Sequence, residues 1–357
     1  MSQTQRLITI FTPSHADSAG TNAQQLTVKE IVARLPSDRF RVVMFCAEQP
    51  DARIAARPNT LLIPAGPHGN TRRFLTRLLR ERPDIYFFPR TGPLDRIIFD
   101  LRKFAGLKTA LVSYIVMAMN DRTAGPMIRR SIREGTAVFG NSVHVSETIQ
   151  QMFGIDAPPM YDGIDRRFYF PPEERSKDVR TENSNPVVLY AGSFQSRKRV
   201  ELIIQQAAQY PEVQFRLAGR GETEAGCRAL AKELGCHNVH FIGHLSPAEL
   251  GDEMRRADLF LFPSILEGHP QVLGQAAACG LPSIAMNVYR PDYVRNGESG
   301  FLVESDAELA DKLGLLLGDA HMRRSMSRAA ALHALKFDWD RIALQWQEVF
   351  ENVTAKR

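Results

Sequence analysis

Long apolar runs and closely spaced cysteines are both missing from this sequence. No apolar stretch approaches the roughly 18–20 residues that a membrane span requires, and residues 1–10 lack the apolar core of a signal peptide. The 357 residues include only 4 cysteines, which are scattered without a pairing rhythm. We therefore expect neither a membrane-spanning protein nor a disulfide-stapled secreted domain, and a reducing cytoplasm is the expected location.

Several kinds of binding motif are incomplete or absent. Gly219-Arg220-Gly221 lacks the third glycine of a dinucleotide-binding fingerprint, and no P-loop lysine motif occurs. The run from Cys236 to His244 contains three histidines, but its middle is predicted to be a strand, whose side chains alternate between faces and do not converge on a metal. The basic residues lack interleaved aromatics. We therefore expect no metal, no redox or ATPase chemistry and no nucleic-acid partner.

Positive charge is concentrated in the N-terminal half of the sequence. Residues 1–185 contain 26 Lys and Arg against 19 Asp and Glu, although the net charge of the whole chain is only +5. This asymmetry favours an anionic partner, such as a phosphate, an acidic glycan or an anionic membrane surface. Residues 71–82 are arginine-rich and amphipathic, with apolar side chains at positions 74, 75, 78 and 79. They predict a helix that packs on the core, and peripheral contact with the cytoplasmic face of the membrane is the alternative.

Strands and helices alternate along the whole chain, which is long enough for two domains. In the first half, strands are predicted at residues 6–11, 40–46, 84–88, 108–112 and 137–140, with a helix at 23–34. In the second half, strands are predicted at 187–190, 214–218, 239–242 and 259–262, with helices at 200–209, 222–234 and 247–257. This alternation predicts an α/β fold of two doubly wound, Rossmann-like domains, with ligands in a central cleft that the two domains face.

A polar, proline-flanked segment separates the two halves. Residues 171–186 show no apolar period, which is typical of a linker. We therefore expect an N-terminal domain at 1–170, the linker at 171–186 and a C-terminal domain at 187–337. The last segment, at 338–357, contains a helix with Trp339 and Trp346 and is expected to pack back on the N-terminal domain.

The segment from 259 to 282 is the most informative part of the chain. An apolar strand ends at Pro263, and a short loop then carries the acid Glu267. Pro270 occupies the expected first position of a helix, and Gly280 comes where that helix should stop. Because a helix N-terminus attracts anions, this arrangement predicts a carboxylate next to a phosphate-binding position.

This segment resembles the donor-site signature of the retaining glycosyltransferases of family 4. That signature has two glutamates separated by seven residues in the frame E-G-x-P-x-V-x-x-E-A, followed by C-G-x-P. Here the frame runs from Glu267 to Ala276 and is followed by Cys279-Gly280-Leu281-Pro282. One position departs from the family pattern, because the second glutamate is replaced by Gln275.

The resemblance extends over nearly the whole chain, from residue 6 to about residue 353. Its other parts are Asp162-Gly163-Ile164-Asp165 with Phe168 and Pro171, the stretch from Gly192 to Val200, Phe241-Ile242-Gly243, and Ala257-Asp258. No single part is decisive, but their order and spacing together are specific. The family's two-domain fold, called GT-B, is therefore the expected fold, with acceptor binding in the N-terminal domain and nucleotide-sugar binding in the C-terminal domain.

The resemblance implies which residues would hold the donor's diphosphate. Lys198 lies where the family keeps its phosphate-binding lysine, and a solvated turn is the structural alternative. The family's arginine five positions earlier is Ser193 here. Arg197 or Arg199 could replace that charge, and the sequence does not decide between them.

The remaining implied site residues surround the donor's sugar and ribose. Glu267 would contact the sugar, with an exposed loop acid as the alternative, and Gln275 would meet the ribose hydroxyls. Gly20 matches the family's glycine-rich loop, where the backbone approaches the donor, or is a plain turn glycine. His269 could contact phosphate or sugar. The other donor-binding positions are Gly268, Pro270 and Gln271.

The function that the resemblance implies is a metal-independent, retaining, hexosyltransferase-like enzyme of polysaccharide biosynthesis. It would move a sugar from a nucleoside-diphosphate-sugar donor to an acceptor hydroxyl, glycan or lipid-linked, with Glu267 and Lys198 as catalytic residues and without any cofactor. The departures at Ser193 and Gln275 motivate an alternative, a non-catalytic partner with a degenerate donor site. A sugar phosphorylase is a third reading, for which no pyridoxal-phosphate signature is present.

Overall fold

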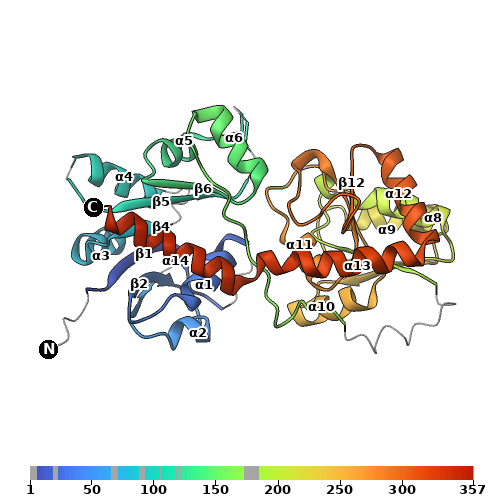
Figure 1. Cartoon of the computed structure of the whole chain (residues 1–357), viewed down its shortest axis with the longest axis horizontal. Helices are drawn as coiled ribbons and strands as arrows, with labels where there is room; N and C mark the ends of the chain where they lie inside the picture. Colours follow the sequence, from blue (N-terminus) through green and yellow to red (C-terminus); the bar gives the residue numbers. More distant parts are fainter. Residues whose placement is uncertain are drawn as a thin grey trace. The chain divides into compact units, whose positions relative to one another are not determined.

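The computed structural model describes residues 6–18, 23–65, 71–87, 93–104, 106–117, 119–120, 122–172 and 185–356. The chain divides into two compact units, each built around its own parallel sheet (Figure 1). Unit 1 comprises Met1–Gly163 and Trp339–Arg357, and unit 2 comprises Ile164–Asp338. The last helix of the chain therefore belongs to the first unit.

Unit 1 contains a six-stranded sheet in the order β3-β2-β1-β4-β5-β6, and every strand pair in it is parallel. Its strands are β1 (Ile8–His15), β2 (Phe40–Cys46), β3 (Thr60–Pro64), β4 (Ile85–Phe87), β5 (Ala110–Ile115) and β6 (Ala137–Gly140). Its helices are α1 (Ala23–Arg34), α2 (Ala52–Ala55), α3 (Thr71–Glu81), α4 (Pro93–Phe104), α5 (Pro126–Arg133), α6 (Val143–Phe153) and α14 (Trp339–Ala355).

Both faces of the unit 1 sheet are buried, as expected for parallel strands. Because side chains alternate along a strand, Ile10 enters one apolar cluster and its neighbour Phe11 enters the other. Helix α14 completes the first cluster, where the Trp346 ring lies 4.8 Å from the Phe87 ring and 5.2 Å from the Tyr114 ring, measured between centroids. This burial explains why the C-terminal residues are part of unit 1.

Unit 2 repeats the same topology with the order β12-β11-β10-β7-β8-β9, again with parallel pairs throughout. Its strands are β7 (Val187–Ala191), β8 (Gln214–Ala218), β9 (Val239–Gly243), β10 (Leu259–Phe262), β11 (Ser283–Met286) and β12 (Gly300–Val303). Its α-helices are α8 (Val200–Gln209), α9 (Glu224–Glu233), α10 (Pro247–Arg256), α11 (Gln271–Ala278), α12 (Asp306–Gly318) and α13 (Ala320–Ala334). Three short 3₁₀ turns are η1 (Ser196–Lys198), η2 (Asn287–Tyr289) and η3 (Leu335–Phe337).

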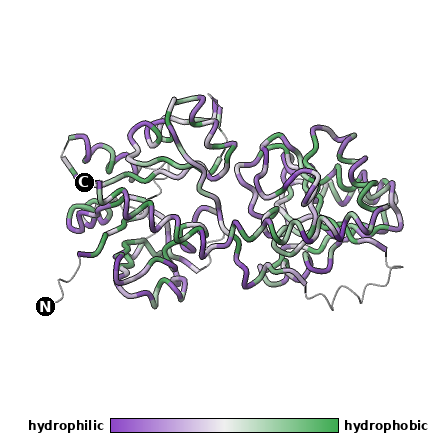
Figure 2. The backbone as a smooth tube through the Cα atoms, viewed as in Figure 1, coloured by the Kyte–Doolittle hydropathy of each residue, from purple (hydrophilic) through white to green (hydrophobic). Residues whose placement is uncertain are grey.

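The predicted α/β fold class of two doubly wound sheets is confirmed. Figure 2 shows hydrophobic residues recurring along the chain of each unit, interleaved with hydrophilic ones. Several details differ from the sequence-based expectation. Strands β3, β11 and β12 and helices α12 and α13 had no predicted counterpart, and β1 begins at Ile8 and extends to His15 rather than ending at Phe11.

Two predicted features fall on parts of the chain that are not described. Gly20 lies outside the described residues, and so do residues 173–184 of the predicted linker. Helix α3 is described, and its Phe74 and Leu78 side chains are fully buried, whereas Leu79 is 47% exposed and does not share their buried face. Membrane contact through this helix stays a prediction. Among the described residues, no helix is long and apolar enough to cross a membrane.

Candidate functional site

The strand order of unit 2 creates a point where two neighbouring strands lead in opposite directions. Strands β7 and β10 pair directly, but the chain leaving β7 continues toward β8 on one side, and the chain leaving β10 continues toward β11 on the other. Ligands of doubly wound sheets bind at the carboxyl ends of the strands at such a switch point. The segment from Ser193 to Lys198 follows β7, and the segment from Ser264 to Pro270 follows β10.

The loop after β7 is held by close backbone packing against the loop after β8. The Gly192 N–H donates to the Ala218 carbonyl at 3.0 Å, and the Phe194 N–H donates to the Arg220 carbonyl at 2.9 Å. A Cβ atom on Gly219 would lie 1.8 Å from the Gly192 carbonyl oxygen, and Gly219 also has a φ of +135°. Gly219 is therefore required by the approach of two loops. Gly219 therefore has a structural reason to be glycine, although it is not part of a complete dinucleotide-binding motif.

The side chains of Lys198 and Arg199, at the end of the 3₁₀ turn η1, have different environments. Lys198 is buried, with Nζ 4.7 Å from the centroid of the Phe262 ring. Arg199 has a φ of 56°, a left-handed conformation, and its guanidinium pairs with Asp306 at the surface. The turn thereby separates Arg199 from Lys198, although the two are adjacent in sequence.

Glu267 is the point at which these segments meet. Its Oε1 atom lies 2.6 Å from Lys198 Nζ and 2.6 Å from Arg197 Nη1, and it also accepts the hydroxyl hydrogen bond of Ser264. Arg197 additionally donates to the Leu266 carbonyl at 2.7 Å, which anchors the guanidinium to the Glu267 loop. The structure therefore brings together two predicted residues that lie far apart in sequence. Of the two candidate replacement arginines, Arg197 is the one beside Lys198 and Glu267.

Burial affects the protonation of Lys198 in this cluster of charges. The Lys198 side chain is only 9% exposed, and this desolvation lowers the pKa of its ammonium group, while the charge of Glu267 partly offsets the shift. The cluster holds two cations against one carboxylate and so has an excess of positive charge. Such a site is suited to a multiply charged anion that could take over both cations.

Helix α11 begins directly after this loop. The structure corrects one predicted position: Pro270 has an extended ψ of 100° and is the N-cap, so the helix starts at Gln271. No side chain of the described residues caps this N-terminus. Gly280 lies just past the helix end, as predicted, and has a left-handed conformation with a φ of +65°. Gln271 and Gln275 are four residues apart and lie on the same face, where both are half-buried.

The remaining predicted site residues have different environments. His269 is buried, and its ring stacks on Tyr293 at a centroid distance of 3.8 Å, while burial lowers its pKa to about 3. Its imidazole is therefore neutral and packed inside unit 2. Ser193 is exposed and its carbonyl accepts a hydrogen bond from the Tyr190 hydroxyl, and Gly268 lies in the bend between Glu267 and helix α11.

Two residues of this site were not found by sequence reasoning. Ser264 was overlooked, although its position three residues before Glu267 allows a local hydrogen bond in a turn. Tyr289 ends the turn that follows the unpredicted strand β11, at the sheet edge that also carries the Glu267 loop, and nothing in its local sequence points to Glu267. Within the described ranges, no group of three or more His, Cys, Asp or Glu side chains could hold a metal ion.

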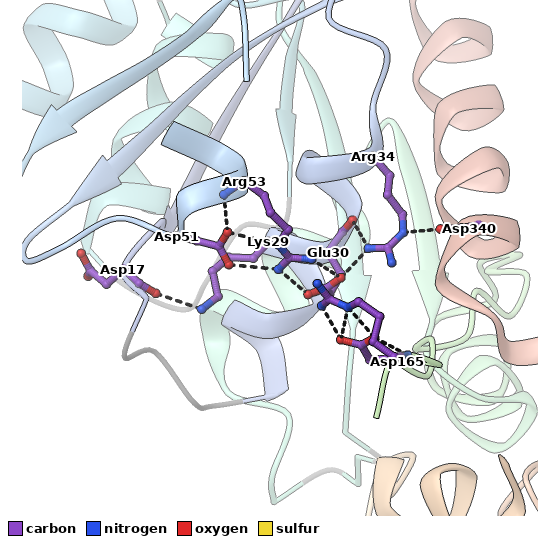
Figure 3. A network of polar contacts seen from close by, with 9 residues as sticks. Asp17, Lys29, Glu30, Arg34, Asp51, Arg53, Asp165 and Asp340 are labelled. Carbon is purple, nitrogen blue, oxygen red and sulfur yellow. Dashed lines mark hydrogen bonds and ion pairs between the residues drawn. The ribbon is translucent and has the colours of Figure 1, made fainter. Parts of the chain in front are cut away.

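A different polar network occupies the corresponding edge of unit 1 (Figure 3). The Glu30 carboxylate, on α1, accepts two hydrogen bonds from Arg53, at 2.9 and 2.6 Å, and also pairs with Arg34. Asp51 caps helix α2, and Lys29 donates to the Asp17 carbonyl at 2.9 Å. These contacts fix the loops after β1 and β2 to α1. The buried charges of Glu30 and Lys29 therefore have a structural role at this edge of the sheet.

The chain is similar in sequence to one family of known proteins. The sequence model of the family described as "Glycosyl transferases group 1" matches residues 172–333. The D-inositol 3-phosphate glycosyltransferase of Mycobacterium leprae (strain Br4923) is 32% identical over 197 residues, covering 50% of this chain and 45% of that protein. The chain thus spans about half the length of the curated relatives it matches.

Two solved structures share the fold over almost the full chain. Sucrose-phosphate synthase (tll1590) from Thermosynechococcus elongatus covers 99% of this chain and 100% of its own, with a TM-score of 0.81 and 19% identity. Anabaena Alr3699/HepE in complex with UDP covers 97% of this chain and 100% of its own, with a TM-score of 0.77 and 18% identity. At such identities the likeness establishes the fold and does not extend to a substrate.

Proposed function

We propose that this chain is a group 1 glycosyl transferase that moves a sugar from a nucleoside-diphosphate-sugar donor to an acceptor hydroxyl. The observation that carries the proposal is the meeting of Lys198, Arg197 and Glu267 at the switch point of the unit 2 sheet. Breaking the bond between sugar and diphosphate requires stabilisation of a departing anion. Preorganised cations in a water-poor site supply such stabilisation most effectively.

In the proposed mechanism, Lys198 and Arg197 bind the donor's diphosphate together with the N-terminus of helix α11. The ammonium of Lys198 is desolvated and already held in place, so little reorganisation accompanies binding. The helix N-terminus adds backbone N–H groups and a partial positive charge. Arg197 thereby supplies the second cation in a chain that has Ser193 at the family's arginine position.

Glu267 has two roles in this proposal. Without a donor it pairs with both cations, which gives the buried ammonium of Lys198 a counter-charge. When a diphosphate takes over those cations, the carboxylate is free to accept hydrogen bonds from hydroxyls of the donor sugar. The sugar is then placed between Glu267 and the departing diphosphate.

Gln275 is proposed to contact the ribose of the nucleotide. An amide offers one acceptor oxygen where a carboxylate would accept two charge-assisted hydrogen bonds, so ribose binding should be weaker than in relatives with glutamate. We further propose that transfer retains the configuration at the sugar carbon, requires no metal and serves polysaccharide biosynthesis. The acceptor is proposed to be a glycan or lipid-linked hydroxyl.

Ser193 and Gln275 replace the family's arginine and second glutamate, and these departures motivate one alternative function. A protein of this fold could act as a non-catalytic partner with a degenerate donor site. The pairing of Arg197 with Glu267 favours the enzyme, because it restores a second cation at the diphosphate position. Nucleotide binding and turnover distinguish the two functions.

The experiment that tests the proposed function is a thermal-shift titration with UDP, GDP and ADP. A ligand present at about 100 times its Kd adds roughly 2.7 kcal/mol to the free energy of unfolding, which raises the Tm of a domain of this size by about 5–10 °C. We expect this rise for one nucleotide and expect Lys198→Ala to abolish it. No rise with any of the three nucleotides would contradict the proposal and favour the non-catalytic partner.

A matched pair of arginine variants tests the mechanism. Arg197→Ala should weaken binding of the same nucleoside diphosphate by about ten- to hundred-fold, because a charge-assisted hydrogen bond is lost. Arg199→Ala is the control, since its guanidinium pairs with Asp306 at the surface. Equal effects of the two substitutions would refute the assignment of Arg197 to the diphosphate.

A further inference from the structure

The hydroxyl of Tyr289 is buried without a hydrogen-bond partner among the described residues. The Tyr289 residue is 2% exposed, and its hydroxyl makes no hydrogen bond with any residue that the structure describes. Such a group has lost its hydrogen bonds to water without replacing them, which is costly, and native proteins contain few of them. An unsatisfied polar group in a native core therefore requires a functional or structural explanation.

Tyr289 lies at the same edge of the unit 2 sheet as Glu267. Strand β11 pairs with β10 through Phe262 and Ala285, and turn η2, which ends at Tyr289, leaves the carboxyl end of β11. The Glu267 loop leaves the carboxyl end of β10 beside it. Asn287 Nδ2 donates to Glu304 Oε1 at 2.5 Å, which fastens the turn. The tyrosine is therefore held at this edge.

The charge of Glu267 acts on this phenol. Burial and the nearby carboxylate both raise the pKa of Tyr289 well above its usual range. The hydroxyl is consequently protonated at neutral pH. It can donate one hydrogen bond and accept others.

A second donor without a partner in the described part of the chain lies at the start of helix α11. Gln271 is the first residue of α11, and its Nε2 atom is buried without a partner among the described residues. Tyr190 provides a contrast at the end of β7, because its hydroxyl donates to the Ser193 carbonyl at 3.0 Å. The Tyr289 hydroxyl and Gln271 Nε2 thus lie at the same sheet edge as the Glu267 carboxylate, which can only accept hydrogen bonds.

We propose that the Tyr289 hydroxyl, together with the Gln271 amide, binds hydroxyl groups of the donor sugar held at Glu267 and so helps to select the sugar. The inference rests on the proposed function. Sugar hydroxyls both donate and accept hydrogen bonds. They match a site in which the Glu267 carboxylate accepts, Gln271 Nε2 donates and the Tyr289 hydroxyl does both. A site with buried polar groups discriminates strongly against a sugar that leaves them unpaired.

The test compares Tyr289→Phe with Tyr190→Phe by calorimetric titration. The donor is whichever of UDP-glucose, UDP-galactose, UDP-N-acetylglucosamine and GDP-mannose the wild type binds most tightly, and its nucleoside diphosphate is titrated in parallel. Tyr289→Phe should weaken binding of the nucleotide sugar about ten-fold and leave the Kd of the nucleoside diphosphate within about two-fold. Tyr190→Phe should leave the ratio of the two Kd values unchanged.

Stability provides an independent signature. Removing an unsatisfied hydroxyl should leave the ligand-free Tm of Tyr289→Phe unchanged or raised, whereas Tyr190→Phe loses a formed hydrogen bond and should have a lower Tm. Gln271→Leu is a second variant at the same site and should also weaken binding of the nucleotide sugar selectively.

The outcomes separate the inference from the function on which it rests. Wild-type protein that binds none of the nucleotides would overturn both. Wild-type binding with an unchanged Kd ratio in Tyr289→Phe and in Gln271→Leu would overturn the inference alone. An equal loss of sugar and diphosphate binding in both variants would also overturn it, because the residues would then only support the loop.

Discussion

Replacing Glu267 by glutamine removes one negative charge from a cluster that also holds two cations. Glutamine keeps the shape of the side chain and one acceptor oxygen, so the hydrogen bond from Ser264 can survive. The change leaves Lys198, whose side chain is 9% exposed, without a counter-charge. Removing one partner of a buried ion pair costs about 3–5 kcal/mol, because the other charge stays buried and uncompensated.

The expected loss in the free energy of unfolding lies at the lower end of that range, about 3 kcal/mol, because the amide oxygen can still accept from Lys198. The pair with Arg197 adds little, since that guanidinium is 37% exposed and solvent screens it. For a unit of this size, about 3 kcal/mol lowers the Tm by roughly 6–12 °C. Glu298→Gln makes the same chemical change in an exposed pair with Arg295 and should cost at most about 1 kcal/mol.

The loss in Glu267→Gln should also depend on pH. Burial lowers the pKa of Lys198 in the folded protein, so between that pKa and the ordinary value near 10.5 the unfolded state binds more protons and stability rises with pH. Without Glu267 the pKa of Lys198 in the folded protein falls further. The pH range between this pKa and the ordinary value, in which the folded state holds neutral lysine, therefore becomes wider. The difference between variant and wild type should therefore shrink as pH rises.

Far-UV circular dichroism at pH 7 and pH 9.5 measures this effect on unit 2. Tryptophan fluorescence would not, because Trp339 and Trp346 both belong to unit 1. A variant within about 1 kcal/mol of the wild type at pH 7, or a deficit equal at both pH values, would refute the reasoning. The affinity of the variant for a nucleoside diphosphate should equal or exceed that of the wild type, because both cations are then free for the ligand.

Two further predictions concern Gln275 and Asp162. Gln275→Glu should tighten nucleotide binding by about ten-fold, or roughly 1–2 kcal/mol, because a carboxylate accepts two ribose hydroxyls; an unchanged or weaker affinity in a calorimetric titration would contradict the ribose assignment. Burial raises the pKa of Asp162 to about 6 from 3.8, so the folded state binds the extra proton and stability falls as pH rises between these values, by about 3 kcal/mol. Asp162→Asn should remove this slope, and parallel stability curves for variant and wild type between pH 4 and 7 would show the reasoning to be wrong.

The local elements of this protein could largely be predicted from sequence. Apolar runs of strand length and the proline and glycine around helix α11 are local signals, and the strand β10 and the end of α11 agree with them. Strand β3 was missed because its apolar run is short and ends at Pro64. The choice of Glu267 and Lys198 as site residues came from motif resemblance, and the structure brings the two together.

The sequence by itself determined the alternation of strands and helices, because hydrophobic period and helix caps act over a few residues. Only the tertiary structure decided which side chains share the site. The order β12-β11-β10-β7-β8-β9 places β7 beside β10 and β10 beside β11. Arg197 and Glu267 therefore form an ion pair although they follow different strands, and the turn that ends at Tyr289 leaves the same edge of the sheet. The left-handed backbone at Arg199 turns that residue toward Asp306, and stacking on Tyr293 turns His269 into the core. These outcomes depend on contacts between distant segments, which no local pattern encodes.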